Sequence, residues 1–143
     1  MTHVLIVEGS EEDRDLLRQL LERNGCRVTA ASNGLEALTA ARRDPPEVIV
    51  SGVLMPKMDG YALCRAWMRN SAFKAIPFIF YSSSYVRPDA GQFAIPLGAA
   101  RYLVKPLQAE AFLGELRAVL QQGTGRTASS PAAPLDAAFR VPR

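Results

Sequence analysis

Short apolar runs alternate along this chain with longer segments in which apolar residues recur every three or four positions. The apolar runs fall at residues 3–8, 27–31, 47–51, 77–82 and 101–105. Runs of this length with little polar alternation are typical of strands that are buried on both faces of a parallel sheet. The pattern therefore predicts five strands that are connected by helices.

Helix signals fill the segments between the strands. Ser10 is a predicted N-cap, and the three residues after it are acidic, as the first turn of a helix favours. Further helices are expected at about 34–44, 60–70 and 110–121, and one more must lie between residues 82 and 99. Pro96 should leave that helix short or irregular, because proline lacks the backbone donor that a helix interior needs. Strands that alternate with helices in this way predict an α/β fold, a doubly wound five-stranded parallel sheet with five helices.

The first two predicted helices each carry one apolar stripe that is expected to face the sheet. The stripe of the first helix consists of Leu16, Leu17, Leu20 and Leu21, and that of the second consists of Leu35, Leu38 and Ala41. Apolar residues at this spacing lie on one side of a helix.

Composition indicates one globular domain. The chain has 143 residues, of which 48% are hydrophobic and 22% charged, and no apolar run approaches the roughly 20 residues of a membrane span. The N-terminus lacks the basic start and long apolar run of a signal peptide, so we expect a cytoplasmic protein without membrane contact. Cys26 and Cys64 are far apart in the sequence and are expected to be free thiols.

Positive charge is partly a property of the C-terminal segment. Lys and Arg total 17 against 14 Asp and Glu, and residues 124–143 contribute three of the basic residues and one of the acidic ones. The preceding residues are therefore close to neutral, which argues against nucleic-acid binding by this domain. Residues 123–143 are small, polar and Pro-rich, and we interpret them as a flexible linker or disordered tail after a domain that spans residues 1–122.

Several short motifs follow the predicted strands in a fixed order. "VEGS" follows the first strand, "LMPKMDG" follows the third, Ser82 closes the fourth, Tyr102 lies in the fifth, and Lys105-Pro106 ends it. Together they resemble, over residues 3–122, the receiver domain of bacterial two-component response regulators, the CheY-like superfamily with a flavodoxin-like fold. The segment "SSSYVRPDAGQFA" is similar to those receivers that are fused to sensory or kinase modules.

The resemblance implies a specific chemistry. In this family a histidine kinase donates a phosphoryl group to an aspartate at the end of the third strand, and two acids after the first strand help to hold Mg²⁺. A lysine neutralises the phosphoryl group, and a Ser or Thr hydroxyl acts with an aromatic switch residue. Phosphoryl transfer of this kind depends on positioning and on charge neutralisation.

Two positions of this chain depart from the family pattern. The phosphoacceptor position is Gly52, and the acidic-pair positions are Glu8 and Gly9, whereas the switch and lysine positions are retained. The retained positions are Ser82, Tyr102, Lys105 and Pro106. We therefore expect no catalytic residue, no enzymatic activity and no metal site, with Mg²⁺ binding weak or absent. Glu8 and Lys105 are predicted to form an ion pair; the alternative is that both point to solvent.

The predicted function is that of a pseudo-receiver, a non-phosphorylatable protein–protein interaction module of the phosphorelay. Its partners would be a histidine kinase or a covalently linked sensory or output domain. The resemblance also implies homodimer formation through the face of the fourth helix, fifth strand and fifth helix, which would include Arg101 and Tyr102. Two alternatives remain: an orthodox receiver phosphorylated through a compensating acid, and a small-anion-binding domain that uses Lys105 and Ser82. Asp59 is the first acid after Gly52 in the sequence, but it is predicted to be a helix N-cap.

Overall fold

The computed structural model describes residues 1–83 and 90–125, and it confirms the predicted α/β fold. Its elements are β1 (His3–Val7), α1 (Glu11–Arg23), β2 (Arg27–Ala31), α2 (Gly34–Arg43), β3 (Val48–Ser51), α3 (Gly60–Arg69), β4 (Phe78–Ser83), α4 (Ala90–Leu97), β5 (Arg101–Lys105) and α5 (Ala109–Gly125). The strands form one sheet in the order β2-β1-β3-β4-β5, and each neighbouring pair is parallel.

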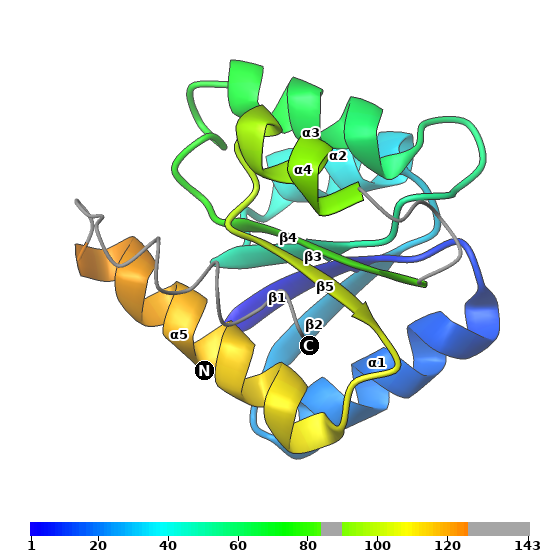
Figure 1. Ribbon diagram of the computed structural model, residues 1–143, viewed down its shortest axis with the longest axis vertical. Helices are drawn as coiled ribbons and strands as arrows, with labels where there is room; N and C mark the ends of the chain where they lie inside the picture. The colour runs from blue at the N-terminus through cyan, green and yellow to red at the C-terminus, as the bar shows by residue number, and fades with distance from the viewer. Residues whose placement is uncertain (84–89, 126–143) are drawn as a thin grey trace.

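The sheet lies between two layers of helices. Helices α1 and α5 cover one face, and α2, α3 and α4 cover the other (Figure 1). Leu5 and Val7 of β1 belong to the core on the α2–α4 side, whereas Val4 and Ile6 belong to the core on the α1–α5 side. All five residues of β1 are buried, which is why this strand reads as a continuous apolar run.

Helix termini follow the predicted capping signals. The Ser10 hydroxyl accepts a hydrogen bond from the Asp13 amide at 3.2 Å, and the Asp59 carboxylate accepts one from the Ala62 amide at 2.9 Å. Both caps satisfy backbone donors that have no partner within the helix. Helix α4 is short and contains Pro96, as predicted.

Three details differ from the sequence-based expectation. Leu16 is 61% exposed and Leu35 is 49% exposed, so neither lies in the buried stripe of its helix. Each is one residue away from a position that faces the sheet, and one residue is a rotation of about 100° on a helix. Helix α5 extends through Gly125, three residues past the predicted end of the domain, while residues 126–143 of the predicted tail lie outside the described part of the chain.

Chain order in the sheet determines where a site can form. The chain moves from β1 outward to β2, and then returns to β3 on the other side of β1. At such a reversal the loops after the two strands separate and leave a crevice at the carboxyl edge of the sheet.

In the ranges 1–83 and 90–125, no helix is both long enough and apolar enough to cross a membrane.

Candidate functional site

Four of the predicted site residues lie at the carboxyl edge of the sheet. Glu8 directly follows β1, Gly52 directly follows β3, and Ser82 and Lys105 lie at or near the ends of β4 and β5. The backbone amide of Gly52 donates to the Val7 carbonyl at 2.9 Å, which joins the ends of β1 and β3. Because the strands are parallel, their ends bring together residues that are almost a hundred positions apart in the sequence.

The Glu8 side chain occupies the space beside Gly52. Gly52 is buried, and a Cβ atom built on it would lie 3.2 Å from Glu8 Oε1. The carboxylate of Glu8 therefore takes up the position into which a side chain at residue 52 would project. Gly60 has a related role in the following turn, because a Cβ atom there would clash with the Gly52 carbonyl oxygen. This turn can close only with glycine at position 60.

Lys105 forms an ion pair with the Glu8 carboxylate. Its Nζ atom donates to Glu8 Oε1 at 2.9 Å and lies 3.4 Å from Asp13 Oδ2. The Lys105 and Glu8 side chains are only 24% and 14% exposed, so both are largely withdrawn from solvent. The ammonium group also lies over the ring of Tyr81, 5.3 Å from its centroid, within the range of a cation–π interaction. The predicted Glu8–Lys105 ion pair is confirmed, and the alternative, in which both side chains point to solvent, is wrong.

Asp13 is the participant that sequence reasoning missed. From the sequence, Asp13 is only a first-turn acid that interacts favourably with the dipole of α1. The turn that follows Glu8 brings the start of α1 back over the edge of the sheet, and the Asp13 carboxylate reaches Lys105 from there. Its position five residues after Glu8, in the first turn of the next helix, was the available signal.

Backbone contacts hold Glu8 in this position. Glu8 Oε2 accepts a hydrogen bond from the Ser10 amide at 3.3 Å, and the Glu8 carbonyl accepts one from Arg14 Nη1 at 2.7 Å. The Glu8 amide donates to the Ala31 carbonyl at 3.0 Å. Hydrogen bonds thus restrain both the backbone and the carboxylate of Glu8, and the carboxylate is directed toward Gly52 and Lys105.

The donor set does not fit Mg²⁺. Of the three positions at which the resemblance places acids, only Glu8 has a carboxylate in this chain, and that carboxylate already accepts a hydrogen bond from Lys105. No group of three or more His, Cys, Asp or Glu side chains placed to bind a metal occurs within residues 1–83 and 90–125. Protein sites for Mg²⁺ offer free carboxylate oxygens, and the only carboxylate in this set is already bonded to a cation. Gly9 is exposed, and a Cβ atom on it would make only ordinary contacts, at 3.4 Å or more.

Ser82 and Tyr102 form a second group on the other face of the sheet. Ser82 is 5% exposed, and Tyr102 packs against Phe80 with 5.7 Å between the ring centroids. The Tyr102 hydroxyl is buried and has no hydrogen-bond partner of good geometry in the described part of the chain. Burial raises the pKa of this hydroxyl, and the neighbouring Ser82 hydroxyl opposes the effect only in part.

Pro106 is exposed and follows Lys105 through a cis peptide bond.

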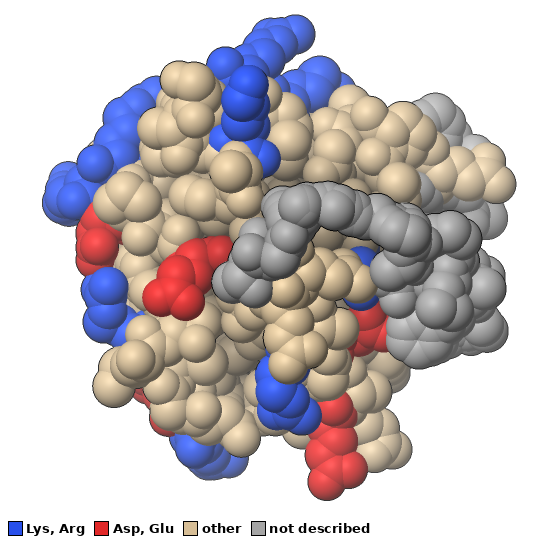
Figure 2. Space-filling model, turned by 90° about the vertical axis from the view of Figure 1, so that its left-hand side faces the viewer, with Lys and Arg blue, Asp and Glu red and all other residues tan. Residues whose placement is uncertain are grey.

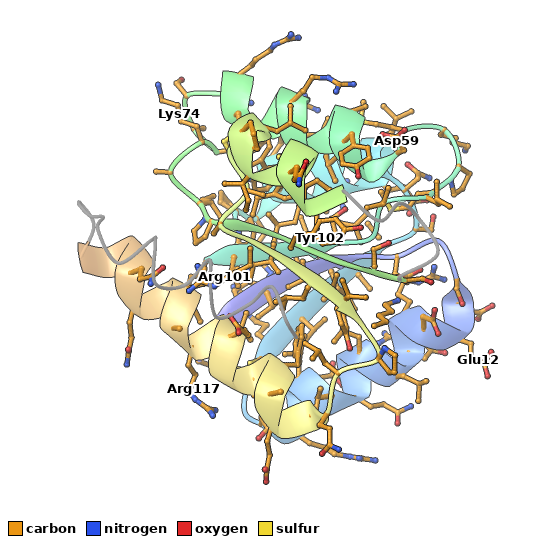
Figure 3. All side chains as sticks on the ribbon, viewed as in Figure 1. Glu12, Asp59, Lys74, Arg101, Tyr102 and Arg117 are labelled. Atoms are coloured by element: carbon orange, nitrogen blue, oxygen red, sulfur yellow. The ribbon has the colours of Figure 1, made fainter. Side chains whose placement is uncertain are left out.

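The prediction that Arg101 lies on an exposed docking face is wrong. Arg101 is 3% exposed and lies between β5 and α5, where its Nε atom pairs with Glu115 Oε1 at 2.9 Å (Figure 3). Its Nη1 atom also donates to the Ala100 carbonyl at 3.0 Å and to Gln122 Oε1 at 3.4 Å. Arg101 begins β5 on the face that α5 covers, so its charge is compensated inside the protein.

Comparison with known proteins gives matches over most of the chain. The sequence profile of the response regulator receiver domain matches residues 4–117. The protein PilG of Pseudomonas aeruginosa is 35% identical over 115 residues, which are 80% of this chain and 84% of PilG. The transcriptional regulatory protein CseB of Streptomyces coelicolor is 35% identical over 123 residues, and the chain spans about half (50%) of its length.

A solved structure agrees with these sequence matches. The signal receiver domain of a signal transduction histidine kinase from Syntrophus aciditrophicus superposes with a TM-score of 0.79 at 31% identity. The match covers 92% of this chain and 98% of that domain, so the agreement extends over most of the chain.

Proposed function

Since this chain belongs to the family of response regulator receiver domains, which act in two-component signalling, we propose that it is a receiver that accepts no phosphoryl group and acts through protein contacts. One observation carries the proposal. The space beside Gly52, the residue that the resemblance assigns to the phosphoacceptor position, is filled by the Glu8 carboxylate, which is bonded to Lys105.

Charge balance supports this function. A phosphorylatable site concentrates carboxylates, and it depends on a divalent cation to relieve their repulsion and to neutralise the phosphoryl group. Here the Lys105 ammonium balances Glu8 directly, with Asp13 at its other side. This arrangement pairs the charges of the site within the protein, and Gly52 offers no side chain that could act as the nucleophile.

The alternatives have weaker support. Asp59 is one candidate for the compensating acid, yet its carboxylate caps α3 by accepting from the Ala62 amide at 2.9 Å, and the carboxylates of Glu8 and Asp13 lie against Lys105. A small anion would have to use Lys105, but this ammonium group already has two carboxylate partners. Either alternative would require an existing interaction to be broken first.

We place the protein contacts on the face formed by α4, β5 and α5. Helix α4 contains no charged residue, and it exposes Ile95 at 49%. On β5, Val104 is 37% exposed. Exposed apolar side chains that occur together are typical of interaction surfaces. A histidine kinase, a covalently linked sensory or output domain, or a second copy in a homodimer would use this face.

Acetyl phosphate with Mg²⁺ provides the test of phosphorylation. We expect the intact mass of the protein to remain unchanged after incubation, while a Gly9→Asp/Gly52→Asp variant gains the mass of one phosphoryl group under the same conditions. The double variant is a positive control, because it returns acids to both positions on the same scaffold. Phosphorylation of the unmodified protein on any acidic residue would contradict the proposal.

A further inference from the structure

Basic side chains gather at the end of the molecule that lies opposite the site. They come from the last turn of α2, from α3 and from the loop that leads to β4, and all are exposed. The five residues are Arg42, Arg43, Arg65, Arg69 and Lys74, and we call them the basic end. Figure 2 shows basic side chains along the upper left of this face of the molecule. Figure 3 shows Lys74 at one end of the molecule and Glu12 of α1 at the other.

In the described part of the chain, the side chains of the basic end differ from other basic residues in lacking ion-pair partners. Within residues 1–83 and 90–125, none of the five forms an ion pair or a side-chain hydrogen bond, whereas Arg18, Arg27 and Lys105 each pair with a carboxylate. Residues 60–76 contain no acid. Asp44, which borders the basic end, is already bonded to Arg27 at 2.7 Å, and Glu47 is exposed nearby in the sequence. Positive charge therefore prevails at this end of the fold.

Helix dipoles account for only some of these residues. Arg42, Arg43 and Arg69 lie in the last turns of their helices, where a cation stabilises the helix. Arg65 lies in the middle of α3, and Lys74 lies in the loop beyond its end, so the dipole does not explain either residue. The basic end thus holds more positive charge than helix stability requires.

The distribution of charge indicates the class of partner. The first turn of α1, at the opposite end, carries Glu11, Glu12 and Asp13, so the molecule is polarised although its net charge is only +3. A small net charge gives little long-range attraction for a long polyanion, whereas a local cluster attracts a short acidic segment. Guanidinium groups, which form most of this cluster, bind carboxylates through two parallel hydrogen bonds.

We propose that the basic end docks an acidic segment of a partner protein. Nucleic acid is the weaker candidate, because the aromatic residues here, Trp67 and Phe73, are buried and offer no surface on which bases can stack. The surface is formed by α2, α3 and the loop after α3, at the opposite edge of the sheet from Gly52. It is therefore distinct in position from the site at Gly52.

A labelled peptide of alternating glutamate and serine is the probe, with binding followed by fluorescence anisotropy at low and at physiological salt. We expect binding that weakens as salt increases, and no binding of the matched glutamine–serine peptide. The Arg65→Gln/Arg69→Gln/Lys74→Gln variant should bind the acidic peptide about tenfold more weakly, since each lost charge pair at a solvated surface has a modest effect.

A second triple variant separates the location of charge from its amount. Arg23→Gln/Lys57→Gln/Arg117→Gln removes the same number of positive charges from exposed positions elsewhere, and it should retain peptide affinity within about twofold. Circular dichroism melting curves of both variants establish that each is folded before binding is compared.

Other results would overturn the proposal. Equal losses of peptide affinity in the two triple variants would show that the effect depends on net charge and not on location. Absence of peptide binding would show that the basic end is not a docking surface. A DNA duplex that bound more tightly than the peptide, and lost affinity in the first triple variant, would make this a nucleic-acid surface. Concentration-dependent sedimentation of the free protein, abolished in the first triple variant, would assign the surface to a second copy of this chain.

Discussion

The Glu8 carboxylate lies beside Gly52 and accepts a hydrogen bond from the Lys105 ammonium at 2.9 Å. This contact joins the ends of β1, β3 and β5, which are distant in the sequence. It also pairs the positive charge of Lys105 within the protein. The carboxyl edge of the sheet is consequently held together by an internal ion pair between Glu8 and Lys105.

Glu8→Gln should lower the free energy of unfolding by about 1–2 kcal/mol. The substitution leaves Lys105 largely buried with Asp13, at 3.4 Å, as its remaining carboxylate partner. Removal of one partner from a fully buried pair costs about 3–5 kcal/mol, and we reduce this value because both side chains retain some solvent contact. Urea unfolding at neutral pH measures the difference. Asp13→Asn, at a more exposed carboxylate, should cost less than about 0.5 kcal/mol; a larger loss there than in Glu8→Gln would contradict this account.

Gly52→Asp alone should destabilise the protein when no divalent cation is present. The new Cβ atom would lie 3.2 Å from Glu8 Oε1, so the added carboxylate is forced close to an existing one. We expect a loss of about 1–2 kcal/mol from repulsion between like charges, and a smaller loss for Gly52→Ala, which adds the Cβ atom without the charge. Unfolding curves without Mg²⁺ compare the two variants.

Mg²⁺ should stabilise the Gly9→Asp/Gly52→Asp variant and leave the unmodified protein unchanged. A ligand that binds only the native state raises its stability in proportion to the logarithm of ligand concentration. Unfolding at increasing Mg²⁺ concentration measures the effect in both proteins. Saturable stabilisation of the unmodified protein would show that Glu8 and its neighbours bind Mg²⁺ after all.

The buried ion pair between Arg101 and Glu115 should respond differently to single and double substitution. Glu115→Leu removes the carboxylate that pairs with the buried Arg101 guanidinium at 2.9 Å, and we expect a loss of about 3 kcal/mol. Arg101→Met/Glu115→Leu removes both charges and should lie within about 1 kcal/mol of the unmodified protein. Urea unfolding of Arg101→Met, of Glu115→Leu and of the double variant completes this double-mutant cycle. A double variant less stable than Glu115→Leu would mean that the pair stabilises the fold beyond what apolar packing can replace.

Stability should decline at alkaline pH because of Cys64. Burial raises the pKa of its thiol to about 12 from an ordinary value of 9.0, so the native state holds this proton more tightly than the unfolded chain does. This contribution is complete below about pH 9 and is lost as the pH rises toward 12, by up to about 1.4 kcal/mol per pH unit. Unfolding between pH 8 and about pH 10.5 should show a steeper decline for the unmodified protein than for Cys64→Ala. Burial also raises the pKa of Tyr81 and Tyr102, so a shallower decline remains in the variant, and equal slopes would exclude Cys64 as the cause.

Apolar patterning and helix signals were sufficient to predict the architecture. The five apolar runs became the five strands within one residue at either end, and Ser10 and Asp59 cap their helices as expected. These features depend on residues that are close in the sequence, so local rules apply to them directly. The exposed positions of Leu16 and Leu35 could not be predicted in this way, because which side of an apolar stripe faces the sheet depends on how the helix packs.

The sequence, read with the family resemblance, predicted that Gly52 offers no side chain at the end of the third strand and that Glu8 and Lys105 form an ion pair, and the structure confirms the ion pair. Only the tertiary structure decided that Glu8 fills the space beside Gly52, that Asp13 joins the pair and that Arg101 is buried against Glu115. It also brought the basic residues of α2 and α3 to one end of a molecule with little net charge. The physical reason is that electrostatic interactions depend on distance and on exposure to water, and the fold determines both.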